Sequence, residues 1–231
     1  MGGRGASIGG TKTRERYRLV PAGTIDGAGE SVGHESKEVR AYKEAHEEFI
    51  QNLSPKERKS LRLYTKHGDE MMNAMLRSGD VSMEFLDRKF GYSKSEKLGA
   101  LKGIDTLQKV MEKSKSINKK SAILYRGTEL DEFHVKSFAE LKKLEGSKRR
   151  TEGFYSTSTS QGFSGDVQVR ILRPPGTAGI HIESISHYKN EQETLLNHNQ
   201  KYVVTRVKKG TIDTPYGPSG EKILVDIVLL K

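Results

Sequence analysis

The first half of the chain repeats hydrophobic residues at helical spacing between charged residues. Over residues 35–53 this pattern predicts an amphipathic helix whose apolar stripe consists of Val39, Tyr42, Phe49 and Leu53. A second helix is predicted to follow at once. The run Ser54-Pro55-Lys56-Glu57 has proline at the first helical position and glutamate three residues after a capping serine. Leu61 and Tyr64 then form its buried stripe.

Three more helices are predicted before residue 120. The first contains Met71, Met72, Met75 and Leu76, and the second covers residues 82–90. The third covers residues 95–111, and its inward-facing side chains are Leu98, Leu101, Ile104, Leu107 and Met111. Methionine clusters mark binding grooves in some proteins, but at this spacing they indicate an ordinary hydrophobic core.

After Ile123 the pattern changes to short β-rich runs separated by glycine and proline. Strands are predicted at residues 167–172, 202–207 and 223–230. Helices that precede strands, and do not alternate with them, predict an α+β domain and not a doubly wound parallel sheet. No Gly-x-Gly-x-x-Gly run follows a predicted strand, so a dinucleotide would not bind in a Rossmann crevice.

Composition separates the N-terminal segment from the rest of the chain. Residues 1–33 contain nine glycines and few large apolar side chains, so they cannot bury enough surface to offset the entropy of ordering a backbone. We expect a flexible tail there and one domain at residues 34–231. This domain is expected to divide into a helical lobe at residues 34–120 and a β core at residues 121–231.

Composition also limits the class of protein. The 231 residues include no cysteine, and the seven histidines show no zinc-ligand spacing, which excludes disulfides and argues against metal catalysis. No stretch reaches the apolar length of a membrane span, and the first residues lack the apolar core of a secretion signal. We therefore expect no membrane partner and a cytoplasmic location, in a bacterial host or in a target cell.

The formal net charge of +10 raises the question of a nucleic-acid partner. The charge is spread along the chain, with no block of five or more like charges, which favours an ordinary solvated basic surface. Attraction of this surface to an acidic protein or to nucleic acid is left open.

Three short polar motifs occur in order in the second half. They are Tyr125-Arg126-Gly127, Ser156-Thr157-Ser158 and Glu191-Gln192-Glu193. Because strand residues two apart share a face, Glu191 and Glu193 are expected to project together. Paired carboxylates suit a reaction through a positively charged sugar, since one stabilises the charge and the other takes a proton from the nucleophile. Each motif alone is common on solvated strands.

In this order the motifs resemble those of the mono-ADP-ribosyltransferases of the Arg-Ser-Glu class, from about Leu53 to Val207. That class includes bacterial actin-modifying toxins, vertebrate ecto-transferases and phage-encoded transferases. The resemblance implies an α+β ADP-ribosyltransferase-like fold, in which a helical lobe precedes two packed β-sheets with NAD+ in the cleft between them. It also implies NAD+ as co-substrate, no metal, and a partner protein that carries an acceptor arginine.

The resemblance further implies a role for each motif residue. Arg126 holds the NAD+ diphosphate or the adjoining ribose, with a surface ion pair as its alternative. Ser156 orients Glu193, and Glu193 binds the ribose 2'-hydroxyl and stabilises the charge that develops as nicotinamide leaves. The other expected cofactor contacts are Tyr125, Gly127, Thr157, Ser158 and Phe163, of which Phe163 has a core position as its close alternative.

Glu191 determines the acceptor in this resemblance. A guanidinium becomes nucleophilic only when a nearby carboxylate helps remove its proton, and family members with glutamate at this place modify arginine. Members with glutamine there modify asparagine or other residues. Tyr188, in the loop of residues 184–190, corresponds to the substrate-recognition loop, with local packing as an equal alternative. The chain departs from several toxins after Phe163, where a second phosphate-binding arginine is replaced by Ser164-Gly165-Asp166.

Three functions of different classes follow from these observations. The first is an arginine-directed mono-ADP-ribosyltransferase, with a transferase that acts on nucleic acid as its variant. The second is an NAD glycohydrolase, in which water replaces the protein acceptor. The third is a non-catalytic binding or phage structural module. Glu191 favours the first over the second, and the joint presence of Arg126, Ser156 and Glu193 argues against the third.

Overall fold

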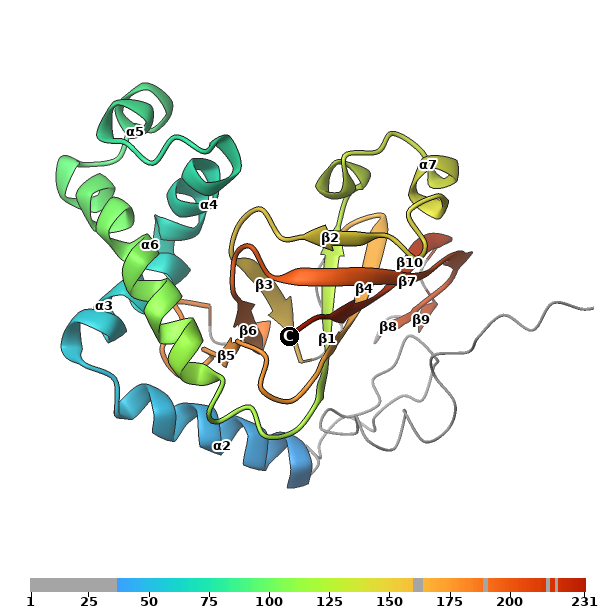
Figure 1. The fold of residues 1–231 in the computed structure, drawn as a ribbon, viewed down its shortest axis with the longest axis horizontal. Helices are drawn as coiled ribbons and strands as arrows, with labels where there is room; N and C mark the ends of the chain where they lie inside the picture. Colours follow the sequence, from blue (N-terminus) through green and yellow to red (C-terminus); the bar gives the residue numbers. More distant parts are fainter. Residues whose placement is uncertain (1–36, 160–163, 189–190, 215–216, 219) are drawn as a thin grey trace, which may run out of the picture.

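The computed structural model describes residues 37–159, 164–188, 191–214, 217–218 and 220–231. The predicted flexible tail at residues 1–33 and Phe163 lie outside the described residues. The helices of the first half gather on one side of the strands (Figure 1). They are α2 (Lys37–Gln51), α3 (Pro55–Leu63), the π-helix η1 (Tyr64–Gly68), α4 (Asp69–Ser78), α5 (Met83–Lys89) and α6 (Lys94–Ser114).

The strands follow the helices in the sequence. They are β1 (Ala122–Thr128), β2 (Lys148–Arg150), β3 (Tyr155–Ser158), β4 (Val167–Arg173), β5 (Ile180–His181), β6 (Glu193–Leu196), β7 (Lys201–Gly210), β8 (Asp213–Thr214), β9 (Gly217–Pro218) and β10 (Lys222–Leu229). The short helices η2 (Leu130–Phe133) and α7 (Phe138–Lys142) lie between β1 and β2. The α+β class predicted from the order of the elements is therefore confirmed.

Eight strands form one hydrogen-bonded sheet in the order β2-β7-β10-β4-β1-β3-β6-β5, and β8 pairs with β9. The expected two packed β-sheets are joined here into one hydrogen-bonded sheet. β1 pairs with β4 along seven residues, from Ala122 to Thr128, but with β3 only where Tyr125 lies opposite Ser158. The β3-β6-β5 part is thus joined to the larger part at one position, because Tyr125 pairs with a strand on each side.

The local helix signals hold in the structure. Ser54 and Glu57 form the predicted capping box, with the Ser54 amide 2.9 Å from Glu57 Oε2. Met71, Met72 and Met75 are completely buried, as expected of core residues. Leu98 is a correction, since its side chain is 38% exposed. The buried stripe of α6 includes Ala100 and Ile104, and Leu98 lies about 160° around the helix from Ala100 and about 120° from Ile104.

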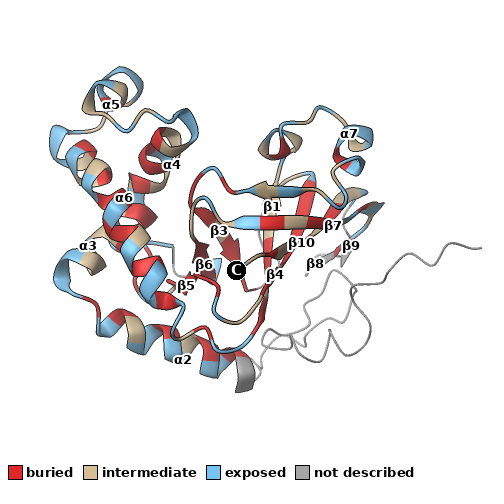
Figure 2. Ribbon diagram, viewed as in Figure 1, coloured by how far each residue is buried: buried red, intermediate tan, exposed pale blue. Residues whose placement is uncertain are grey.

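Buried residues lie on the inner faces of the helices and strands (Figure 2). One apolar cluster lies against the larger part of the sheet and includes Leu124, Val169 and Ile227. The other joins α3, α4 and α6 to the β3-β6-β5 part, where Phe154 and Leu195 meet Met72 and Leu107. No helix in the described ranges has the length and apolarity to cross a membrane.

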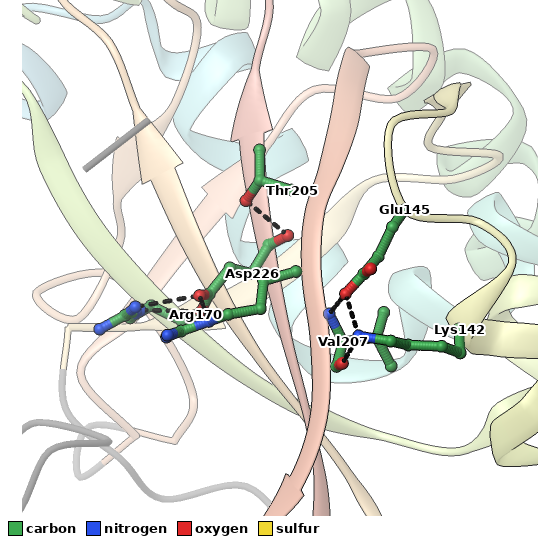
Figure 3. A network of polar contacts seen from close by, with 7 residues as sticks. Lys142, Glu145, Arg170, Thr205, Val207 and Asp226 are labelled. Carbon is green, nitrogen blue, oxygen red and sulfur yellow. Dashed lines mark hydrogen bonds and ion pairs between the residues drawn. The ribbon is translucent and has the colours of Figure 1, made fainter. Parts of the chain in front are cut away.

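A polar network links the neighbouring strands β4, β10 and β7 (Figure 3). Asp226 of β10 accepts from Arg170 of β4 at 2.9 and 3.0 Å and from Arg206 of β7 at 2.6 Å. β7 carries one extra residue against β10 beside Asp226, and Thr205 Oγ1 donates to the Asp226 carbonyl at 3.1 Å. Arg170 lies directly opposite Tyr125 of the first motif, so these contacts stabilise the strands next to β1.

Candidate active site

Arg126 lies within β1, where its guanidinium reaches the neighbouring strand. Its Nη1 donates to the Ser156 carbonyl at 2.8 Å, and its Nη2 pairs with Glu132 Oε2 at 3.1 Å. The guanidinium carbon is 4.3 Å from the centre of the Tyr155 ring. Arg126 Nε is buried and has no hydrogen-bond partner among the described residues. A planar cation is therefore held with one donor still available.

Glu193 begins β6 directly opposite Ser158 on β3. Only 5% of Glu193 is exposed. The pKa of Glu193 is raised to about 7, first by this burial and then by the charges of Glu191 and Asp69, while a hydrogen bond from Ser156 and the Arg126 charge act against the shift. The second and third motifs thus meet in one small volume beside the first.

Glu191 is not on the same strand as Glu193, which corrects the expectation from strand alternation. The strand starts at Glu193, and Gln192 before it has a left-handed φ of 48°. Thr159 Oγ1 donates to Gln192 Oε1 at 3.0 Å, and Ser158 Oγ donates to the Glu191 carbonyl at 2.9 Å. A turn held by these bonds, and not the two-residue strand period, brings the two carboxylates close enough to interact.

The helical lobe contributes polar residues that the sequence patterns missed. The Tyr64 hydroxyl lies 3.3 Å from Ser156 Oγ and accepts from Asn73 Nδ2 at 3.2 Å. Asn73 Oδ1 accepts from the Phe154 amide at 2.8 Å. The sequence pattern predicted Tyr64 as an ordinary buried residue of a helix. The one sequence signal for a further role was its hydroxyl group, which a leucine or phenylalanine at the same position would lack. The π-helix that Tyr64 begins is a further signal, because such turns recur at functional sites.

Asp69, the first residue of α4, is a third carboxyl group near the motifs. Burial raises the pKa of Asp69, and its negative charge raises the pKa values of Glu191 and Glu193. The pKa of Glu191 is raised first by the partial burial of its carboxyl group and second by the charge of Asp69. The acidic pair is therefore an acidic trio that spans the helical lobe and the strands.

Of the remaining predicted residues, some hold the strands of the sheet together and do not face this site. Tyr125 points to the other face of β1 and packs with Ile212 and Leu224, and Gly127 pairs with Gln168 of β4. Thr157 Oγ1 donates to the Thr194 carbonyl at 2.5 Å, which holds β3 to β6. Tyr188 is 57% exposed, so local packing covers less than half of it.

A pocket of ≈ 180 Å³ adjoins Arg126. Glu132 and Tyr155, which both contact the Arg126 guanidinium, line it. Three arginines, Arg77, Arg149 and Arg150, and three acids, Asp131, Glu132 and Glu152, line the same pocket. In the part of the chain that the structure describes, no cluster of three or more histidine, aspartate or glutamate side chains is arranged to hold a metal ion.

Residues 39–231 match the family of ADP-ribosyltransferase exoenzymes. The chain belongs to this family. It is 30% identical over 162 residues to the NAD(+)--arginine ADP-ribosyltransferase EFV of Enterococcus faecalis, a match that covers 68% of this chain and 30% of the relative. It is 25% identical over 170 residues to Photox toxin of Photorhabdus laumondii, covering 69% of this chain and 41% of the toxin. The chain thus spans less than half the length of these two relatives.

Solved structures of ADP-ribosyltransferase toxins share the fold. Plx2a of Paenibacillus larvae has a TM-score of 0.64 at 22% identity and covers 84% of this chain and 94% of its own. C3stau2 of S. aureus, solved with NAD, has a TM-score of 0.64 at 20% identity, and the match covers 88% of this chain and 100% of C3stau2. C2-I of Clostridium botulinum gives 0.64 at 19%, with coverage of 82% and 47%. The expected ADP-ribosyltransferase fold is therefore confirmed. In this chain the fold brings Arg126, Ser156, Glu191 and Glu193 near one another.

Proposed function

We propose that this ADP-ribosyltransferase cleaves NAD+ and transfers ADP-ribose to an arginine side chain of a target protein, with release of nicotinamide. The observation that supports it most is the buried Glu193, which Ser156 hydrogen-bonds and which the charges of Glu191 and Arg126 reach. A carboxylate held in this way is suited to stabilise a positively charged sugar.

The residues beside Arg126 suit the charged part of NAD+. A permanently charged arginine binds diphosphate oxygens through its fork of donors, and Arg126 still has a buried Nε without a partner in the described residues. Its ion pair with Glu132 keeps the guanidinium in place but does not use all of its donors. The adjoining pocket contains Arg77, Arg149 and Arg150 but also three acidic side chains, so recognition of the phosphates is assigned to Arg126.

The proposed bond cleavage places charge next to Glu193. The bond between the ribose C1' and the nicotinamide nitrogen breaks, and its electron pair leaves on nicotinamide, which becomes neutral. Glu193 in its ionised form stabilises the positive charge that develops on the ribose, and the Ser156 hydrogen bond keeps the carboxylate oriented. Tyr64 and Asn73 support Ser156 from the helical lobe.

Glu191 is placed for the second half of the reaction. It is exposed at the edge of the site, while Glu193 is buried. An incoming guanidinium nitrogen forms the new bond to C1', and the proton that it loses passes to the Glu191 carboxylate. This division of roles supports arginine as the acceptor. Tyr188, exposed three residues earlier in the chain, is the residue that we propose to contact the target protein.

Labelled NAD+ tests this proposal. The purified chain is incubated with NAD+ labelled in its ADP-ribose part and either a host lysate or a small guanidine acceptor such as agmatine. We expect label on the acceptor, with protein bonds that hydroxylamine cleaves, and we expect Glu193→Gln to abolish it. Free ADP-ribose alone would instead indicate a glycohydrolase. Label on nucleic acid would indicate a transferase that modifies nucleic acid. If no labelled product formed at all, the chain would be a binding module. Phage origin and cytoplasmic location stay predictions.

A further inference from the structure

A second pocket, of ≈ 520 Å³, lies at the far end of β6 from Glu193. Its walls are the C-terminal part of α6, the turn at residues 176–177, the connection at residues 197–201 and the last two residues. None of the four motif side chains assigned above lines this pocket. Four residues of extended strand, about 13 Å, separate Glu193 from Asn197 at its wall.

The pocket carries an excess of positive charge. Lys115, Arg150, Lys201 and Lys231 line it, and among the described residues Glu112 is the only acidic side chain in its lining. Glu112 pairs with Lys115 at 2.5 Å. Among the described residues, no carboxylate pairs with Arg150, Lys201 or Lys231. Three cations of this pocket therefore have no counter-charge within the described part of the fold.

Arg150 and Lys201 are directly opposite each other on β2 and β7. Like charges at such a cross-strand pair repel each other and destabilise the sheet. A bound anion between or beside them would remove this repulsion. The juxtaposition therefore indicates an anionic ligand more specifically than net positive charge does.

The wall of the pocket is held firmly by Thr151, which is buried. Thr151 Oγ1 donates to the Asn197 carbonyl at 3.0 Å and accepts from the Gln200 amide at 3.0 Å. The Asn199 amide donates to the Thr151 carbonyl at 2.7 Å, and Asn199 Oδ1 accepts from Arg150 Nη1 at 2.9 Å. Because these bonds fix the connection between β6 and β7, binding there needs little further ordering of the backbone.

We infer that this pocket binds a small compound with several phosphate groups. The volume falls in the range of small-molecule sites. Lysine ammonium groups and an arginine fork are the side chains that bind phosphate oxygens in proteins. Among the described residues Leu230 is the only large apolar side chain in the lining, so they form no apolar slot for a base, and the phosphates supply the recognition. This inference does not depend on the proposed transferase activity.

The test measures binding of tripolyphosphate to the whole chain by calorimetry, with and without saturating NAD+. The variant is Lys201→Gln with Lys231→Gln, because Arg150 also lines the pocket beside Arg126. Lys59→Gln with Lys143→Gln is the matched control, since both lysines are exposed and neither lines the pocket. We expect one site per chain that persists with NAD+, at least about tenfold weaker binding in the variant, and no change in the control.

Further ligands distinguish the source of the phosphates. Equal affinity for ATP and tripolyphosphate would assign recognition to the phosphate chain, and tighter binding of inositol trisphosphate would assign it to a lipid headgroup or its free form. Absence of binding at millimolar tripolyphosphate would overturn the inference. So would displacement by NAD+, equal weakening in the control, or a short single-stranded oligonucleotide that binds the same lysines more tightly than any of these compounds.

Discussion

The Tyr64 hydroxyl lies 3.3 Å from Ser156 Oγ, and this contact joins the helical lobe to the strand beside Glu193. The two residues are 92 positions apart in the chain. Tyr64 is itself held by Asn73 Nδ2 and by an edge-on contact with the Phe154 ring. The orientation of Ser156, and through it that of Glu193, therefore depends on how the helices pack against β3.

Removal of this hydroxyl by Tyr64→Phe is expected to lower kcat on the order of tenfold, the effect of losing one hydrogen bond of about 1.4 kcal/mol. The aromatic contact with Phe154 remains, so the melting temperature is expected to change little. Steady-state NAD+ turnover and thermal unfolding measure the two effects. Tyr92→Phe is the matched control, because the exposed Tyr92 hydroxyl contacts Glu70 instead. A full loss of folded protein in Tyr64→Phe would make Tyr64 structural only.

Glu191→Gln is expected to separate the two halves of the reaction. Transfer to agmatine should fall by at least about a hundredfold, because the acceptor guanidinium loses its base. Slow hydrolysis of NAD+ should persist, because Glu193 and Ser156 are unchanged. Nicotinamide release and labelled agmatine are measured in the same reaction. Equal loss of both activities would contradict the division of roles between Glu191 and Glu193.

The pH dependence of activity should follow Glu193, whose burial raises the pKa to about 7. Only the ionised form stabilises a positive sugar, so kcat/KM should rise through pH 7 and be about tenfold below its plateau at pH 6. Glu191 and Asp69 titrate in the same volume, so the observed value belongs to the group as a whole. A profile that is flat from pH 5 to pH 8 would exclude this role for Glu193.

Glu193 also makes stability depend on pH. The pKa of Glu193 is raised from 4.5 to about 7 by burial, so folding favours the protonated form. Its contribution to stability is fully present below pH 4.5 and is lost as the pH rises through 7. Glu193→Gln should therefore gain stability over the wild type between these pH values, by about 3 kcal/mol at most. Urea unfolding at pH 4.5 and pH 8 measures the difference, and a constant difference would contradict the prediction.

Asp69→Asn should shift the acidic limb of the pH–rate profile to lower pH. The charge of Asp69 raises the pKa values of Glu191 and Glu193, so removing it lowers both. Glu70→Gln is the control, because Glu70 is an exposed acid in the same first turn of α4. An equal shift in the control would mean that the net charge of the helix, and not Asp69 itself, is responsible.

Gly165→Ala should destabilise the fold by about 1–3 kcal/mol or more. Gly165 has φ of 134°, and a Cβ there would lie 2.5 Å from the Thr128 carbonyl oxygen at the end of β1. Gly91→Ala is the control, because a Cβ at Gly91 meets nothing within 4 Å and its φ is not in the left-handed region. Chemical unfolding compares the two. The Ser164-Gly165-Asp166 segment, where several toxins have an arginine, is thus constrained by its contact with β1.

Local sequence determined the helices and strands of this protein. The capping box of Ser54 and Glu57 and the stripe of Met71, Met72 and Met75 act within a few residues, so their outcome does not depend on distant partners. Three motifs in order also identified the family before any contact between them was known. The prediction that Leu98 faces inward was wrong, because the sequence pattern allows more than one side of α6 to be buried. Packing of α6 against α3 and α4 buries a side that leaves Leu98 exposed.

Tertiary structure alone decided the geometry of the candidate site. Glu191 approaches Glu193 through the left-handed turn at Gln192, which Thr159 holds from the residue after β3. Glu132 pairs with Arg126 from η2, and Tyr64 reaches Ser156 from a helix. Each of these contacts depends on how separate elements pack in three dimensions. Spacing along the chain specifies a residue's own helix or strand, whereas its partners across the site are set only when the helices pack onto the sheet.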